Sequence, residues 1–254
     1  MKKVILFLSV IITVSMMTSC LDGGNDNYRD SSFVYLGTDG RGAMYGKTFS
    51  RWSPYSRLIT TSSMMTMDPG TIKFMAYSWD EDNGTTSIQI GDQTFQADNV
   101  ILIDKVTDVP SRYLNMIELP EEEDPAAFDD ILAPLYSNEK SFMNDYWIIE
   151  YGYSAKKGET GRVEFYKKDE LNDKGEVVIY AQLTISGTPE GTTLEQRGDV
   201  LALNMSQLRS MSEGGEDQVL KVKFEFYKNK GENMDPELTG TTTIDWKIGV
   251  EDEQ

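Results

Sequence analysis

The residue types that most often carry enzyme chemistry are scarce in this 254-residue chain, which contains no histidine and a single cysteine, Cys20. Without histidine there is no Ser-His-Asp triad, no histidine-bound zinc and no imidazole acid or base. One thiol excludes internal disulfides and thiolate metal clusters. Paired carboxylates could still hydrolyse glycosides, but 42 Asp and Glu residues make any such pair unspecific. Because the chain also lacks a Gly-rich phosphate loop and a nucleophile elbow, we expect no catalytic residues, no cofactor and no enzyme activity.

The cysteine lies just after an apolar segment near the N-terminus. Met1-Lys2-Lys3 is a basic start, and the run Val4–Val14 is too short to span a bilayer, which needs about 20 residues; this arrangement is typical of a signal peptide. Met17-Thr18-Ser19-Cys20 resembles the lipobox of bacterial lipoproteins, with methionine in place of the usual leucine. The resemblance implies that residues 1–19 are removed and that Cys20 carries a lipid, whose buried acyl CH₂ groups each contribute about 0.8 kcal/mol. An ordinary secretory peptide is the alternative.

Residues 20–31 are polar, Gly-rich and acidic, which indicates a flexible tether. An acidic stretch after the cysteine resembles the cell-surface display signal of Bacteroidota lipoproteins, and Asp22 and Asp26 fit it loosely; a plain solvated spacer is the alternative. We therefore expect an outer-membrane lipoprotein, surface-exposed or periplasm-facing, that contacts the membrane through the lipid on Cys20.

The formal charge of -18 repels phosphate backbones, so we expect no nucleic-acid partner. Residues 40–67 depart from this acidity, because they contain four cations and no acid. A candidate ligand-binding patch within them consists of Arg51, Trp52, Tyr55 and Arg57. Exposed aromatic rings flanked by arginines can stack on a sugar or hold an anionic group. Alternatively, Trp52 covers the core and the cations pair with an acidic linker further along the chain.

Apolar and polar residues alternate through much of the chain, which predicts half-buried antiparallel strands. The alternation is clearest at residues 72–77, 177–185, 220–226 and 242–248. The chain shows no long amphipathic helix, and one helical turn is expected at residues 206–211. The fold class is therefore all-β, with a small barrel followed by an antiparallel β-sandwich.

A break in composition separates these two domains. Residues 119–141 contain three prolines and an acidic run, which predicts a linker with one helical turn near Phe128–Leu132. We assign residues 32–118 to the barrel, because closing short strands into a barrel removes exposed edges. Residues 142–250 are assigned to the sandwich and residues 251–254 to a tail.

Two shorter segments each have two interpretations. Asp80-Glu81-Asp82-Asn83-Gly84 looks like a calcium loop, but it fails the EF-hand spacing of glycine at the sixth position and glutamate at the twelfth. We predict a hairpin turn at Asn83-Gly84 and no metal site, although carboxylate-rich surfaces can take calcium adventitiously. Met64, Met65 and Met67 form either a flexible contact surface or core filler.

Two segments of the second domain carry a family resemblance: Asp145-Tyr146-Trp147-Ile148-Ile149-Glu150-Tyr151, and Val200 to Arg209, which ends in a Ser-x-Leu-Arg turn. These two segments and the lipobox resemble the NigD-like lipoproteins of the Bacteroidota. The first domain adds similar segments at Ile59-Thr60, Pro69-Gly70 and Tyr77-Ser78-Trp79-Asp80. The resemblance implies an OB-like barrel and a C-terminal β-sandwich over nearly the whole mature chain. It provides no catalytic residues, and the family name carries an association with bacteriocin immunity.

From these features we expect a non-catalytic, lipid-anchored envelope protein that binds a macromolecule or glycan, with bacteriocin immunity as a special case. The alternative is a structural or accessory subunit of an envelope or fimbrial assembly, which would need an accessible strand edge. A carboxylate-based glycoside hydrolase is a remote alternative. The sequence leaves the oligomeric state open.

Overall fold

The computed structural model describes residues 27–51, 56–117, 119–120, 126–138, 143–168, 171–211, 218–230 and 235–248. The signal peptide, Cys20, most of the tether and the tail 251–254 lie outside these residues, and so do Trp52 and Tyr55 of the predicted patch. The chain divides into two compact units, Met1–Val109 and Pro110–Gln254.

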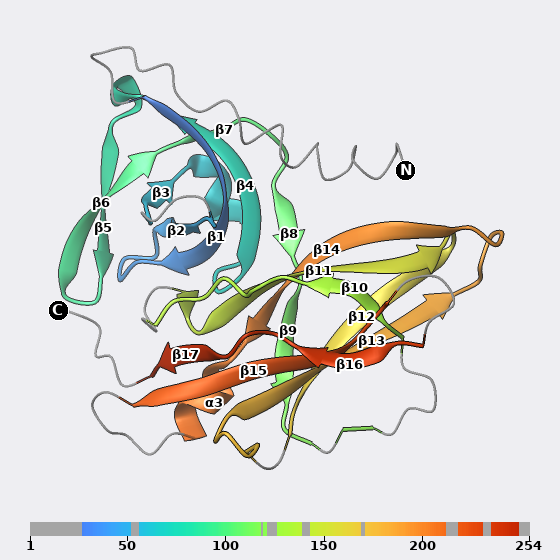
Figure 1. Cartoon of the computed structure of the whole chain (residues 1–254). Helices are drawn as coiled ribbons and strands as arrows, with labels where there is room; N and C mark the ends of the chain where they lie inside the picture. The colour runs from blue at the N-terminus through green and yellow to red at the C-terminus, as the bar shows by residue number, and fades with distance from the viewer. Residues whose placement is uncertain are drawn as a thin grey trace. The chain divides into compact units, whose positions relative to one another are not determined.

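The first unit is built on one eight-stranded sheet. Its strands are β1 (Tyr28–Thr38), β2 (Met44–Phe49), β3 (Leu58–Thr60), β4 (Ile72–Trp79), β5 (Thr85–Ile90), β6 (Gln93–Asn99), β7 (Ile101–Leu102) and β8 (Thr107–Val109), with short 3₁₀ helices η1 (Ser62–Thr66) and η2 (Glu81–Asn83). The order is β5-β6-β3-β2-β1-β4-β7, with β8 paired to β4. The sheet curls around its core (Figure 1).

The main core of the first unit lies on one face of this sheet. It consists of Val34, Leu36, Ile59, Met64, Met75, Tyr77 and Val100. Strand β4 forms over the predicted segment, but its core face carries Met75 and Tyr77, whereas the apolar Phe74 on the opposite face is exposed. The pairing with β1 places Met75 beside the buried Ser32, so the register between the two strands decides which face is covered.

The second unit is built on one nine-stranded sheet. Its strands are β9 (Ser111–Asn115), β10 (Phe128–Ile131), β11 (Tyr146–Lys156), β12 (Glu159–Lys167), β13 (Val177–Gly187), β14 (Leu194–Asn204), β15 (Val219–Lys228), β16 (Glu237–Gly240) and β17 (Ile244–Lys247), with the helix α3 (Ser206–Met211) after β14. The strands follow the order β10-β11-β14-β9-β12-β13-β15, and the pairing of Phe128 with Lys228 joins β10 to β15, which closes these seven strands into a ring.

The core of the second unit lies between the layer of β10, β11 and β14 and the layer of β12, β13 and β15 (Figure 1). Strand β15 buries Val222, Phe224 and Phe226 and turns lysine and glutamate outward, as the alternation predicts. The all-β class is confirmed, and the closed ring of seven strands lies in the second unit, for which the sequence predicts an antiparallel sandwich. The predicted helical turn at residues 206–211 is also confirmed: the Asn204 carboxamide oxygen accepts from the Ser206 amide at 3.0 Å at the start of α3.

The boundary between the two units differs from the predicted one at residue 118. Strand β9 pairs in parallel with both β14 and β12, so the segment that follows Pro110 belongs to the second unit. The predicted linker 119–141 contains β10, which pairs with β11, and the helical turn expected at Phe128–Leu132 is wrong. Phe128 and Ile131 are buried in the second core, which favours the extended strand over a local helical turn.

The hairpin turn predicted at Asn83-Gly84 is also wrong. Strands β4 and β5 are not neighbours in the described sheet, and the residues between them form η2. The Asp80 carboxylate accepts a hydrogen bond from the Asn83 amide at 3.1 Å, and Gly84 ends the turn at a φ of 64°, which glycine adopts readily. This polar loop is therefore a 3₁₀ connection between two strands that pair elsewhere.

Candidate functional site

Arg57 is the residue of the predicted patch that the structure places in a defined cluster. The residue directly precedes β3, and its backbone is fixed to β2: the Arg57 amide donates to the Thr48 hydroxyl at 2.8 Å, and the Thr48 amide donates to the Arg57 carbonyl at 2.9 Å. Its guanidinium carbon lies 4.0 Å from the centre of the Tyr28 ring, within the range of a cation–π interaction. The Arg57 side chain nevertheless remains 47% exposed.

Tyr28 connects Arg57 to the rest of this cluster. Its hydroxyl donates to the Asp98 carboxylate at 2.6 Å, and its ring stacks on Trp79 with centroids 5.7 Å apart. Burial raises the pKa of the Tyr28 hydroxyl, and the hydrogen bond to Asp98 and the charge of that carboxylate raise it further, so the phenol stays protonated. We call Tyr28, Arg57, Trp79 and Asp98 the arginine–tyrosine cluster.

The two charged groups of the arginine–tyrosine cluster are only loosely paired. Arg57 Nη1 lies 3.7 Å from Asp98 Oδ2, which is longer than a direct hydrogen bond. The Tyr28 hydroxyl makes the shorter contact to the same carboxylate oxygen. The guanidinium therefore keeps donor capacity for a ligand, while the ring beneath it fixes its orientation.

The sequence patch and the structural cluster overlap in one residue. Arg51 is described and exposed, whereas the two aromatic members of the patch lie outside the described residues. The aromatic group that the structure places beside Arg57 is Tyr28 of β1, on which Trp79 of β4 stacks. Sequence reasoning missed these two residues and Asp98, because residues this far apart in the chain leave no spacing signal.

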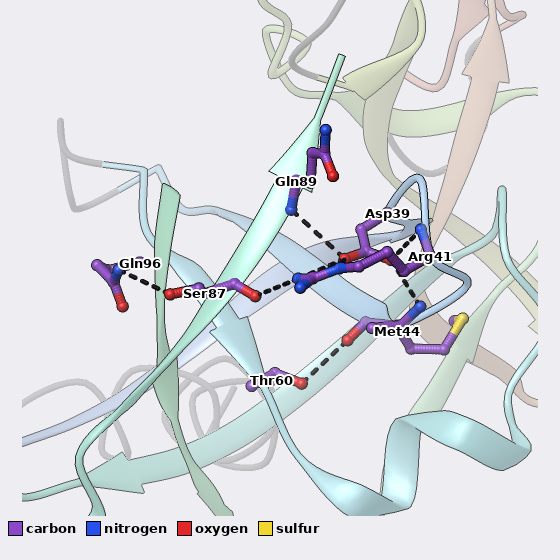
Figure 2. A network of polar contacts seen from close by, with 8 residues as sticks. Asp39, Arg41, Met44, Thr60, Ser87, Gln89 and Gln96 are labelled. Carbon is purple, nitrogen blue, oxygen red and sulfur yellow. Dashed lines mark hydrogen bonds and ion pairs between the residues drawn. The ribbon is translucent and has the colours of Figure 1, made fainter. Parts of the chain in front are cut away.

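A second ion pair in the first unit fixes the turn between β1 and β2 (Figure 2). The buried Asp39 carboxylate accepts from the amides of Arg41 and Ala43, both at 2.8 Å, and from Arg41 Nε and Nη2, both at 3.1 Å. Burial raises the pKa of Asp39, but the hydrogen bonds from these amides, from the Arg41 guanidinium and from the Gln89 amide outweigh it and lower the pKa to about 2. Asp39 is therefore a structural carboxylate.

One alternative raised by the sequence is that the cations of residues 40–67 pair with the acidic linker, and the structure gives partners for two of them, Arg41 and Arg57. Both of these cations have acidic partners within the first unit, and neither partner belongs to the predicted linker 119–141. The two interpretations of the methionines, core filler and contact surface, apply to different residues. Met64 is part of the core, whereas Met65 is exposed.

Four carboxyl groups, those of Asp39, Asp108, Glu176 and Glu225, have lowered pKa values because they accept hydrogen bonds or lie near cations. These side chains are therefore charged at neutral pH. The described residues contain no group of three or more carboxylate or cysteine side chains placed to hold a metal ion. The arrangement in the first unit is suited to binding a ligand.

In the second unit, the two segments that carry the family resemblance meet at an ion pair. Strands β11 and β14 pair from Tyr146↔Asn204 to Lys156↔Leu194, which brings Asp145 and Arg209 together. Arg209 Nε donates to Asp145 Oδ1 at 2.7 Å, and its Nη1 and Nη2 donate to the carbonyls of Ile248 and Asn138 at 2.7 and 3.1 Å. This pair is buried, and the Arg209 guanidinium lies 4.8 Å from the centre of the Trp246 ring.

No family profile matches the sequence, and no curated protein matches it. Solved structures do match over both units. A candidate lipoprotein from Bacteroides fragilis gives a TM-score of 0.56 at 12% identity and covers 87% of this chain and 99% of that chain. A NigD-like immunity protein from Bacteroides caccae gives 0.52 at 10% identity, over 87% of this chain and 97% of that chain. An uncharacterized protein from Parabacteroides merdae gives 0.53 at 10% identity, over 86% and 99%.

These matches define the class of the molecule as a two-unit all-β fold that occurs among proteins of the Bacteroidales genera Bacteroides and Parabacteroides. The resemblance to the NigD-like lipoproteins is confirmed at the level of the fold. In the part of the chain that the structure describes, no helix has the length and apolar content to cross a bilayer.

Proposed function

We propose that this chain is a non-catalytic, lipid-anchored protein of the bacterial cell envelope that binds a glycan or protein partner through the arginine–tyrosine cluster. The observation that carries the proposal is Arg57. Its guanidinium is held over an aromatic ring, is only loosely paired with Asp98 and remains about half exposed. Groups with this geometry interact favourably with sugars, carboxylates and aromatic side chains, and arginine and tyrosine are enriched at binding interfaces.

The lipid anchor rests on two independent observations. The sequence places a lipobox-like segment directly before the single cysteine, Cys20. The fold is shared with a candidate lipoprotein of Bacteroides fragilis over 99% of that chain. An acylated Cys20 would hold the protein firmly, since several acyl chains add their transfer free energies.

Localisation is tested by protease shaving of intact cells that carry a C-terminally tagged copy, with a periplasmic protein as the marker. Display on the outer surface predicts that the tag is lost while the marker survives. A periplasm-facing protein keeps its tag until the envelope is broken. The Cys20→Ala chain should lose its membrane association in both cases, and an unchanged membrane fraction for this variant would contradict lipid anchoring.

Binding is tested with the Cys20→Ala mature chain on immobilised oligosaccharides and on solubilised envelope proteins. Arg57→Ala should weaken binding at least about tenfold, which corresponds to about 1.4 kcal/mol. Arg162→Ala is the matched control, because Arg162 is an exposed arginine of the second unit that pairs with Glu164 at 2.7 Å. Equal binding by both variants would refute a role of the arginine–tyrosine cluster.

Immunity to a bacteriocin is a special case of this proposal. One solved structure with the same fold is described as a NigD-like immunity protein. Deletion of the gene should then sensitise cells to a toxin from a neighbouring strain, and Arg57→Ala should fail to restore protection if the toxin is the partner. If Arg57→Ala restored protection as fully as the wild type, immunity would not depend on the arginine–tyrosine cluster.

A further inference from the structure

The hairpin of β5 and β6 presents a face of uncharged polar side chains. Cross-strand pairing places Thr85 beside Asp98, Ser87 beside Gln96 and Gln89 beside Thr94, so these side chains lie on one face. Five of them are uncharged and exposed: Thr85, Ser87, Gln89, Thr94 and Gln96. We call these five residues the hairpin ladder.

The hairpin ladder is ordered by its own hydrogen bonds. The Gln96 carboxamide donates to the Ser87 hydroxyl at 3.0 Å (Figure 2) and accepts from the Thr85 hydroxyl at 3.1 Å. Part of the conformational entropy of these side chains is therefore already lost before a ligand arrives. Each group keeps further donor or acceptor capacity, because an amide and a hydroxyl can each form more than one hydrogen bond.

The outer edge of β5 is occupied, so its face is the surface that remains for a ligand. The Gly40 amide donates to the Gln89 carbonyl at 3.1 Å, the Gln89 amide donates to Asp39 at 3.4 Å, and Arg41 Nη2 donates to the Ser87 carbonyl at 2.7 Å. These bonds satisfy backbone groups that a partner strand would otherwise use. Figure 2 shows Arg41 between Asp39 and Ser87, which anchors this edge to the β1–β2 turn.

The charge of the hairpin contrasts with that of the whole chain. Asp98 is the one charged residue of β5 and β6, although 26% of all residues are charged and the net charge is -18. Asp98 is itself engaged by Tyr28 and Arg57. An uncharged strip on an acidic molecule is electrostatically matched to an uncharged ligand, whereas a polyanion would be repelled by the surrounding field.

We propose that the hairpin ladder binds a neutral oligosaccharide whose sugar hydroxyls lie along it and whose end meets the arginine–tyrosine cluster. The inference rests on the proposed function and specifies its ligand as an uncharged glycan. The ladder runs from Thr85 to Gln89 along β5, which gives it a length of roughly 14 Å, enough for two or three sugar rings. The link between the two surfaces is direct, because Thr85 pairs with Asp98, whose carboxylate accepts from Tyr28.

The experiment measures binding of the Cys20→Ala mature chain to immobilised hexasaccharides of glucose, mannose, xylose and N-acetylglucosamine, with oligogalacturonate as the anionic comparison. The ladder variant carries Thr85→Ala, Ser87→Ala and Gln96→Ala. The control variant carries Thr160→Ala, Thr184→Ala and Ser186→Ala, which remove three exposed hydroxyls from the β12–β13 hairpin. Circular dichroism verifies that each variant is folded. The single substitution Gln96→Glu tests whether the ladder must be uncharged to bind the glycan.

The expected result is binding to at least one neutral hexasaccharide that the ladder variant weakens more than tenfold, that Gln96→Glu also weakens, and that the control variant leaves unchanged. Binding lost in Arg57→Ala but unchanged in the ladder variant would overturn this inference and leave the proposed function standing. Binding only to oligogalacturonate would overturn the inference that the ligand is uncharged. No binding to any sugar, together with binding of a protein partner that depends on Arg57, would overturn the inference of a glycan ligand. The arginine–tyrosine cluster would then remain the proposed binding site.

Discussion

Each unit of this molecule contains an arginine that lies over an aromatic ring and faces an aspartate, but the two arrangements differ in how completely they are closed. In the second unit, Arg209 and Asp145 are 2.7 Å apart and their side chains are 11% and 1% exposed. In the first unit, Arg57 and Asp98 are 3.7 Å apart and are 47% and 20% exposed. The same residue types therefore occupy a buried structural site in one unit and an open surface in the other.

The difference follows from what surrounds each guanidinium. Arg209 donates to two backbone carbonyls as well as to Asp145, so it connects three segments of the second unit. Arg57 has a ring beneath it and solvent above it. A buried charge is costly to desolvate unless an opposite charge pairs with it, whereas an exposed charge contributes little to stability and remains available to a partner.

The largest effect is expected when the closed pair is broken. Arg209→Ala would leave the Asp145 carboxylate buried without its cation, which should lower the free energy of unfolding of the second unit by about 3–5 kcal/mol. Urea unfolding followed by tryptophan fluorescence measures this loss, since Trp147 and Trp246 lie in the second core. The double variant Asp145→Asn with Arg209→Ala should recover part of this loss, because it leaves no unpaired charge buried. Asparagine also tolerates the φ of 61° at position 145, so the substitution adds little strain.

The control for this prediction is the exposed pair of Arg162 and Glu164 in the same unit. Arg162→Ala should cost less than about 1 kcal/mol. If Arg209→Ala cost no more than Arg162→Ala, the contrast between a closed and an open pair would fail.

An intermediate effect is expected for Asp39 and Arg41, where the carboxylate is fully buried and the cation is 60% exposed. The pKa of Asp39 falls from 3.8 to about 2 on folding, because the hydrogen bonds that it accepts outweigh its burial. A lowered pKa stabilises the fold above the unfolded value, and this stabilisation is lost as the pH falls from about 4 towards 2.

Thermal unfolding of the first unit as a function of pH measures this contribution. Asp39→Asn should lower the unfolding midpoint by several degrees at pH 6, and the difference from the wild type should shrink as the pH falls towards 2, where the Asp39 carboxylate becomes protonated. A difference that stays constant between pH 6 and pH 2 would show that the charge of Asp39 does not stabilise the turn.

The smallest effect on stability is expected at the open pair. Arg57→Ala removes one loose ion pair and one cation–π contact at an exposed site. The free energy of unfolding of the first unit should therefore change by less than about 1.5 kcal/mol. Urea unfolding beside the binding assay separates the two roles. A loss of stability as large as that of Arg209→Ala would mean that Arg57 is a structural residue.

Strands β15 and β17 were predictable because apolar and polar residues alternate along them. Strand β15 has one apolar and one charged face, and β17 places Trp246 in the core within the predicted alternation. Strands β9 and β10 were not predictable, because each is short and lies in or beside the acidic segment. Their partners β11, β12, β14 and β15 follow later in the chain, and pairing with them is a tertiary contact.

The candidate site was predictable in part for a similar reason. The local excess of cations in residues 40–67 drew attention to Arg57. Its aromatic and acidic neighbours reach it from β1 and β6, with Trp79 of β4 stacked on Tyr28, and only the folded sheet assembles them. The hairpin ladder left a faint signal, which is the low charge of residues 85–99, but its common face depends on the register of β5 and β6.

The sequence by itself excluded histidine chemistry and internal disulfides and located the strands with regular alternation, because composition limits reactive groups and a period of two follows from backbone geometry. The tertiary structure alone decided the roles of the arginines. Arg41, Arg57 and Arg209 are identical in chemistry, and the sequence does not distinguish them. The free energy of a charge depends on the solvent, carbonyls and carboxylates around it, and only folding sets these surroundings.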